Sequence, residues 1–133
     1  FPAHYAQVVA QRALRDCELL QAEREVLGID HAQVGRALAE HWRIPDLICR
    51  TIANHHQPMQ QDYGELPAVV HVANVIAHGL DLAGDEDDLV PALVQGAWDS
   101  LRLDPAALRG VFAATEAQFD DTCQILATRP GKE

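Results

Sequence analysis

Residues 28–56 read GIDHAQVGRALAEHWRIPDLICRTIANHH, and this stretch decides the fold because it encodes a helix with a well-marked start. Asp30 follows a glycine suited to end a preceding helix, and its side chain is placed to cap the free amides of the next turn. Val34, Leu38 and Trp42 then recur at four-residue spacing, which places them on one helical face. The pattern predicts a helix that begins just after Asp30.

A turn and a third, short helix follow in the same stretch. Pro45 disfavours helical geometry at the residue before it, so the chain is expected to turn at positions 43–44. The short helix is predicted from Asp46 to about His55, with Leu47, Ile48 and Ile52 buried. The preceding helix also carries a flank of small residues that predicts close approach of another helix: Ala32, Gly35 and Ala39.

The rest of the chain also favours helices. They are predicted over about Pro2–Leu27 with spacing that allows a break, over Leu66–Gly79, over Pro91–Leu101, and from Pro105 to about Leu126. Apolar residues nearly encircle the Leu66–Gly79 segment, so it is expected to be the central, most buried helix. The predicted fold class is therefore all-α, a globular bundle of about six helices without strands. Residues 1–128 are expected to form a single domain, and residues 129–133 a frayed tail.

Composition narrows the classes of function. The chain of 133 residues has 20 acidic and 10 basic side chains, a formal net charge of −10. Such a surface repels nucleic-acid phosphate and anionic membranes, so neither is an expected partner. The longest apolar stretch, Leu66–Leu80, is shorter than the roughly 20 residues that cross a bilayer, and no secretory signal is recognised. A soluble cytoplasmic protein is expected, with its three cysteines, Cys17, Cys49 and Cys123, reduced and buried.

The histidines are the candidate functional residues. His31, His55 and His56 fall at turns between predicted helices, where side chains from different elements converge. Imidazole is a common metal ligand, and the carboxylates of Glu23 and Asp30 are candidates to orient it. The alternative is structural, because a histidine at a helix start can simply hydrogen-bond the backbone. For His71 and His78, which share a helix face, core packing or interhelical hydrogen bonding is favoured over ligation.

Several short motifs follow one another in the chain. They comprise an upstream Glu23, then Gly28-Ile29-Asp30-His31-(x2)-Val34-Gly35, Trp42-(x)-Ile44-Pro45, Ile52-(x2)-His55-His56, and Val70-His71-Val72-Ala73-Asn74. Together, in this order, they resemble the HDOD (HD-related output domain) family of bacterial signalling proteins. The resemblance covers about residues 23–77. It implies an HD-domain-like fold within the wider HD superfamily, whose hydrolases bind metals through histidines and aspartates.

Three differences from the hydrolase pattern argue against catalytic activity. Asn74 stands where the metal-binding relatives have an aspartate, and an amide is a poorer ligand for a divalent cation. The loop after His56 lacks a G-x-G-Y-P segment. The name-giving His-Asp doublet is absent, so the chain is interpreted as the C-terminal portion of a longer HDOD region.

The leading hypothesis is therefore a non-catalytic signal-transduction module that binds other signalling proteins or domains and needs no cofactor. Its expected binding groove contains Glu23, Asp30, His31, Trp42, His55, His56 and Asn74. The alternative is a metal-dependent HD-class phosphohydrolase acting on nucleotides or cyclic dinucleotides. In that case His31, His55 and His56 would hold iron, manganese or a similar divalent ion. A third hypothesis is a helical scaffold in which the histidines only cap and hydrogen-bond. The oligomeric state is left open by the sequence.

Overall fold

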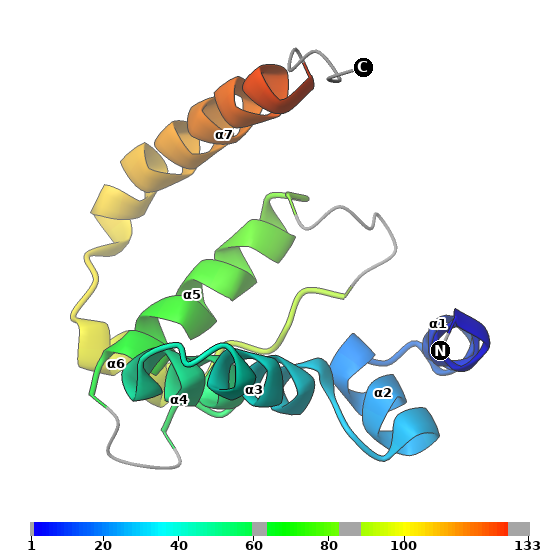
Figure 1. The fold of residues 1–133 in the computed structure, drawn as a ribbon. Helices are drawn as coiled ribbons and strands as arrows, with labels where there is room; N and C mark the ends of the chain where they lie inside the picture. The colour runs from blue at the N-terminus through cyan, green and yellow to red at the C-terminus, as the bar shows by residue number, and fades with distance from the viewer. Residues whose placement is uncertain (1, 60–63, 83–88, 128–133) are drawn as a thin grey trace, which may run out of the picture.

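The computed structural model describes residues 2–59, 64–82 and 89–127, and every regular element in them is an α-helix (Figure 1). The all-α prediction is confirmed. The described helices are α1 (Pro2–Arg15), α2 (Leu19–Leu27), α3 (His31–His41), α4 (Asp46–Asn54), α5 (Leu66–Gly79), α6 (Gln95–Leu101) and α7 (Pro105–Ala127). Helices α1 and α2 pack as one pair and α3 and α4 as another, while α5 contacts both α4 and α6.

The first predicted helix is divided into α1 and α2. Asp16 adopts a φ of 50°, a left-handed conformation that ends α1 and lets α2 fold back on it. Val8, Cys17 and Ala22 form the buried centre of this pair. Helix α2 stops as predicted at Gly28, whose φ of 74° suits glycine and whose N–H bonds the carbonyl of Arg24.

Helices α3 and α4 approach each other closely at the small residues of α3, as the sequence pattern predicts. Ala32 and Ala39 are buried, and a Cβ added to Gly35 would lie 2.8 Å from Cγ2 of Ile52. The expectation that Leu47 and Ile48 are buried is wrong, since they are 53% and 40% exposed. The close backbone contact is made by the small side chains, so the larger apolar side chains lie on the flanks of the pair.

Helix α5 is buried on one face rather than all round. Pro67, Ala68, His71 and Val72 are buried, whereas Val69 and Val70 are exposed. This helix holds more buried residues than any other described helix, so it is central, though much of its apolar surface is open.

Helix α6 starts at Gln95 and not at Pro91 as the sequence indicated. Two backbone amides in residues 89–94 are instead bound by side chains from elsewhere. The N–H of Ala92 donates to Glu18, and the N–H of Val94 donates to His71. These long-range bonds hold the segment extended up to the N-cap, where Val94 has a ψ of 107°.

Helix α7 begins as predicted, because the Asp104 carboxylate caps the N–H of Ala106 at 2.8 Å. The helix stands away from α1–α4 as a long arm (Figure 1). Cys123 on this arm is exposed, which corrects the expectation of three buried thiols, while Cys17 and Cys49 are buried. The frayed tail expected at residues 129–133 lies outside the described residues.

Helices long and apolar enough to cross a membrane are absent from the described part of the chain.

Candidate functional site

Three histidines converge where α3 begins and α4 ends. Because α3 and α4 are joined by a short turn and pack side by side, His31 at the start of one lies next to His55 and His56 at the end of the other. The ring centroids of His31 and His56 are 4.8 Å apart, and those of His55 and His56 are 4.0 Å apart. One ring nitrogen from each of the three lies within 4.8 Å of the others. The structure thus brings together the three histidines singled out from the sequence.

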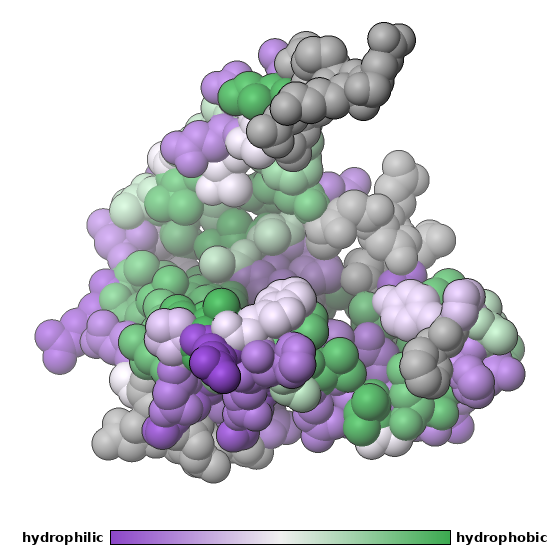
Figure 2. Space-filling view, in the orientation of Figure 1, coloured by the Kyte–Doolittle hydropathy of each residue, from purple (hydrophilic) through white to green (hydrophobic). Residues whose placement is uncertain are grey.

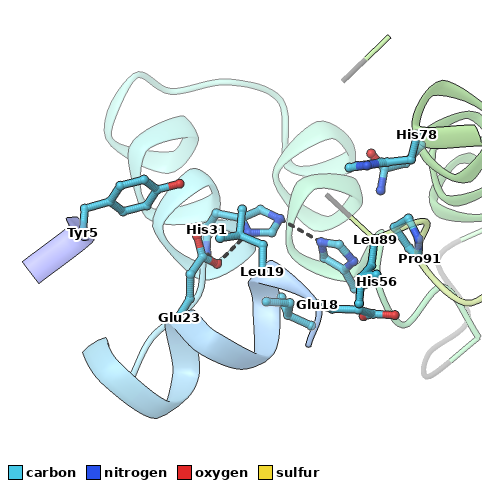
Figure 3. Close-up of a pocket in the computed structure, with 11 residues that line it drawn as sticks. Tyr5, Glu18, Leu19, Glu23, His31, His56, His78, Leu89 and Pro91 are labelled. Atoms are coloured by element: carbon cyan, nitrogen blue, oxygen red, sulfur yellow. Dashed lines mark hydrogen bonds and ion pairs between the residues drawn. The ribbon is translucent and has the colours of Figure 1, made fainter. Parts of the chain in front are cut away.

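A buried carboxylate orients His31. Oε2 of Glu23, on α2, accepts the backbone N–H of His31 at 2.9 Å and its Nδ1 at 2.7 Å. Nδ1 therefore carries the proton, and Nε2 faces the other way, 2.7 Å from Nε2 of His56 (Figure 3). In the neutral pair Nε2 of His31 is the acceptor, so Nε2 of His56 is the donor. The result is one continuous chain of hydrogen bonds from Glu23 through His31 to His56.

His55 is fixed from two sides. Its Nδ1 lies 2.7 Å from the carbonyl of Ile52, so Nδ1 carries the proton and Nε2 is left with a lone pair. Its own carbonyl accepts a hydrogen bond from Nδ1 of His71 at 2.8 Å. Nε2 of His71 accepts the N–H of Val94 at 3.0 Å, which fixes the tautomer of this buried ring. The expected interhelical role of His71 is confirmed: it joins the end of α4 to the start of α6.

Asp30 has a structural role at the start of α3. Its carboxylate accepts the N–H of Gln33 at 2.8 Å, and the Gln33 side chain returns a bond to the N–H of Asp30, completing a capping box. Nε of Arg24 donates to its other oxygen at 2.8 Å. Burial disfavours the Asp30 carboxylate, but the Gln33 N–H and the Arg24 guanidinium outweigh that cost and hold its pKa below the ordinary value.

The environment favours the neutral form of two of the clustered histidines. Burial lowers the pKa of His55, helped by the nearby His31 and His71, although the Ile52 carbonyl opposes the shift. Burial, followed by the neighbouring His55 and His31, lowers the pKa of His56 to about 3. Both rings are therefore neutral at pH 7, and their lone pairs are available as acceptors or ligands.

A cavity of about 180 Å³ opens beside the cluster. Among the residues named in advance, Glu23, His31, His56 and Asn74 line it (Figure 3). The other lining residues are Tyr5, Glu18, Leu19, Leu20, His78, Leu89 and Pro91, from α1, α2, α5 and the segment before α6. No sequence motif pointed to these, because only the tertiary fold brings them to the cluster. Within the described chain, no lysine or arginine lines this cavity.

Trp42 is not part of this site. It lies at the opposite end of α3 from His31, roughly 16 Å along the helix axis at 1.5 Å per residue. There it lines a separate apolar groove between α3 and α4. Asp30 also stays outside the cavity. The predicted groove therefore divides into a polar cavity at the histidines and an apolar groove at Trp42.

Residues 1–58 match the family model of the HDOD domain. This segment is therefore similar to HDOD domains. The match includes α1–α4 and all three clustered histidines, and it reaches upstream of Glu23, where no motif was recognised. It occupies the N-terminal part of the chain and ends before α5, so Asn74 lies beyond it. No curated protein and no solved structure matches the chain.

Proposed function

We propose that this chain is a non-catalytic regulatory module of the HDOD type, which acts in bacterial cytoplasmic signalling by binding other signalling proteins. The observation that carries the proposal is that the carboxylates around the histidine cluster are already engaged. Glu23 binds the backbone and ring of His31, and Asp30 binds Gln33 and Arg24. Glu18 accepts the N–H of Ala92. These carboxylates therefore hold the backbone and side chains around the cluster in place.

The cavity beside the cluster supports the same proposal. Asn74 presents an amide from α5, and an amide binds a divalent cation less well than a carboxylate. The lining described contains no lysine or arginine to neutralise a phosphate. Its volume of about 180 Å³ is also below the roughly 300–1,000 Å³ of ordinary small-molecule sites. A nucleotide or cyclic dinucleotide is therefore disfavoured as its ligand.

A metal-dependent phosphohydrolase is the second candidate, and one observation favours it. The Nδ1 atoms of His31 and His55 are engaged by Glu23 and Ile52, which leaves both Nε2 atoms unprotonated. This is how carboxylate and carbonyl partners prepare imidazoles to ligate a metal. His31, His55 and His56 would hold one ion such as zinc, iron or manganese, which would polarise a bound water or phosphate oxygen.

The distances between the histidine nitrogens match only part of what that ion requires. Two nitrogens bound at about 2.0–2.1 Å in tetrahedral geometry lie about 3.3 Å apart. The Nε2 atoms of His31 and His56 are 2.7 Å apart, the separation of a hydrogen bond. A single ion thus requires these rings to move apart, and a second ion would need a carboxylate that now has other partners.

The direct test incubates the full chain with cyclic dinucleotides, nucleoside phosphates and Mn²⁺ or Fe²⁺, alongside its His55→Ala variant. Product formation is followed by chromatography, and bound metal by elemental analysis. We expect no product above the level of the variant. Metal-dependent turnover by the wild type that His55→Ala abolishes would establish the phosphohydrolase instead.

A further inference from the structure

The groove between α3 and α4 is open and apolar. It encloses about 380 Å³ and is lined by Gly35, Leu38, Ala39, Trp42, Ile44, Ile48 and Ile52. Trp42 is 64% exposed and Leu38 is 44% exposed, and both lie on one face of α3. A lining without polar groups offers no hydrogen bonds to orient a small polar ligand. It suits the apolar face of a helix, which binds through side chains spaced by three and four residues.

Helix α7 carries an apolar stripe that is half-buried in its first half and exposed in its second half. Leu108 and Phe112, in its first half, are half-buried. The same stripe continues at Phe119 and Cys123, which are both exposed. Figure 1 shows this half of the helix standing away from α1–α4, and Figure 2 shows hydrophobic residues among the polar ones along it. Among the residues that the structure describes, the outer half of α7 is thus an amphipathic helix whose apolar stripe is exposed.

The charges of these two surfaces are complementary. The outer half of α7 carries Glu116, Asp120 and Asp121, and none of these carboxylates has an ion-pair partner among the described residues. Arg43, next to Trp42 at the end of the groove, likewise has none in the described part of the chain. Residues 31–55 hold three arginines against two carboxylates, whereas the whole chain has a net charge of −10. The groove therefore lies in a part of the chain with a slight excess of arginine, although the protein as a whole is acidic.

We propose that the α3–α4 groove receives the outer half of α7 from a second copy of this chain. Phe119 enters the groove beside Trp42, and Glu116, three residues before Phe119 on the same side of the helix, pairs with Arg43. The α7 of the same chain leads away from this groove (Figure 1), so the occupant comes from another molecule. Reciprocal exchange gives a two-fold symmetric dimer with two equivalent contacts. The proposal goes beyond the regulatory role and does not depend on whether the histidines are catalytic.

Sedimentation velocity across a dilution series of the full chain tests the proposal. The wild type is expected to be a dimer, with Trp42→Ser and Phe119→Ser each weakening dimerisation about tenfold or more. Leu14→Ser is the matched control, because Leu14 is 82% exposed on α1, outside the lining of the groove. Both test positions are exposed, and circular dichroism confirms that each variant stays helical. A monomeric wild type, or a dimer unaffected by both substitutions, would overturn the proposal.

A charge exchange tests the register. Arg43→Glu and Glu116→Arg each weaken the dimer, and the double variant is expected to recover most of the loss, since the ion pair is reversed but kept. Additive losses in the double variant would show that these residues do not meet and would overturn the proposed register.

Discussion

The two ends of the α3–α4 pair differ in how far the rest of the chain hydrogen-bonds or covers their side chains. At the histidine end, one series of hydrogen bonds joins Glu23, His31 and His56. A second series joins the His55 carbonyl, His71 and the N–H of Val94. At the other end, Trp42 and its apolar neighbours line an open groove with no comparable cover. The same two helices therefore have hydrogen-bonded polar side chains at one end and exposed apolar side chains at the other. Hydrogen-bonded polar groups stabilise and position the helices, whereas an exposed apolar surface can bind a partner.

The largest effect is expected from Glu23→Ala. The variant leaves the backbone N–H and the ring of His31 without their shared acceptor in a buried position. We expect a loss of about 2–4 kcal/mol in the free energy of unfolding, measured in urea. The control is Glu40→Gln, which removes an exposed pair with Arg36 and should cost about 0.5 kcal/mol or less. Equal losses in the two variants would mean that the polar end is not an integrated network.

Replacements of His71 separate its two contacts. His71→Asn places an amide N–H near the position of Nδ1 and keeps the bond to the His55 carbonyl. His71→Gln places an amide oxygen near Nε2 and keeps the bond from Val94. Each should cost about 1–3 kcal/mol, because one buried polar group is left unpaired.

Nuclear magnetic resonance distinguishes the two His71 variants. His71→Asn should shift the amide of Val94 and spare the ring signals of His55 and His56, and His71→Gln should do the reverse. Identical patterns of change would indicate a general loss of packing around His71 rather than two separable bonds.

Asn74→Asp tests whether a carboxylate in place of the amide raises the affinity of the cavity for a divalent cation. The substitution adds a carboxylate beside His31 and His56, so affinity for Mn²⁺ or Zn²⁺ is expected to rise about tenfold in isothermal titration calorimetry. Leu14→Asp, at an 82% exposed position of α1 outside the cavity lining, adds the same charge and should leave the affinity unchanged. A rise as large with Leu14→Asp would assign the effect to net charge.

A further prediction concerns pH. His56 has a pKa of about 3 in the folded protein and about 6.5 when unfolded, so between these values only the unfolded chain gains the proton. Stability should therefore rise with pH from about 3 to about 6.5 and then level off. In thermal denaturation from pH 7 to pH 4, His56→Asn should flatten part of this slope, while His41→Asn, at an exposed position, should not. A slope unchanged by His56→Asn would contradict the burial of the neutral ring.

Local signals predicted the helix boundaries well. The cap at Asp30, the stop at Gly28 and the start at Pro105 each depend on residues within one helical turn. The start of α6 was mispredicted because it depends on His71, 23 residues from Val94 in the sequence. The break at Asp16 was allowed but not located, since its left-handed backbone follows from the packing of α2 on α1.

The histidine cluster could be predicted from the sequence. The separation of the expected groove into a polar cavity and an apolar groove could not. Turn positions place His31 next to His55 and His56 once α3 and α4 are antiparallel. Trp42 belongs to the same series of motifs as these histidines, but the length of α3 separates it from the cavity. Tyr5 and Glu18 reach the cavity only through tertiary contacts that no spacing rule encodes.

We propose that the chain acts by binding and not by catalysis. The rate of bis(p-nitrophenyl) phosphate hydrolysis with Mn²⁺, Fe²⁺ or Zn²⁺, compared between the wild type and His56→Ala, tests this directly. We expect the same background rate for both proteins with every metal. A wild-type rate at least tenfold above that of His56→Ala, about 1.4 kcal/mol of transition-state stabilisation, would contradict it.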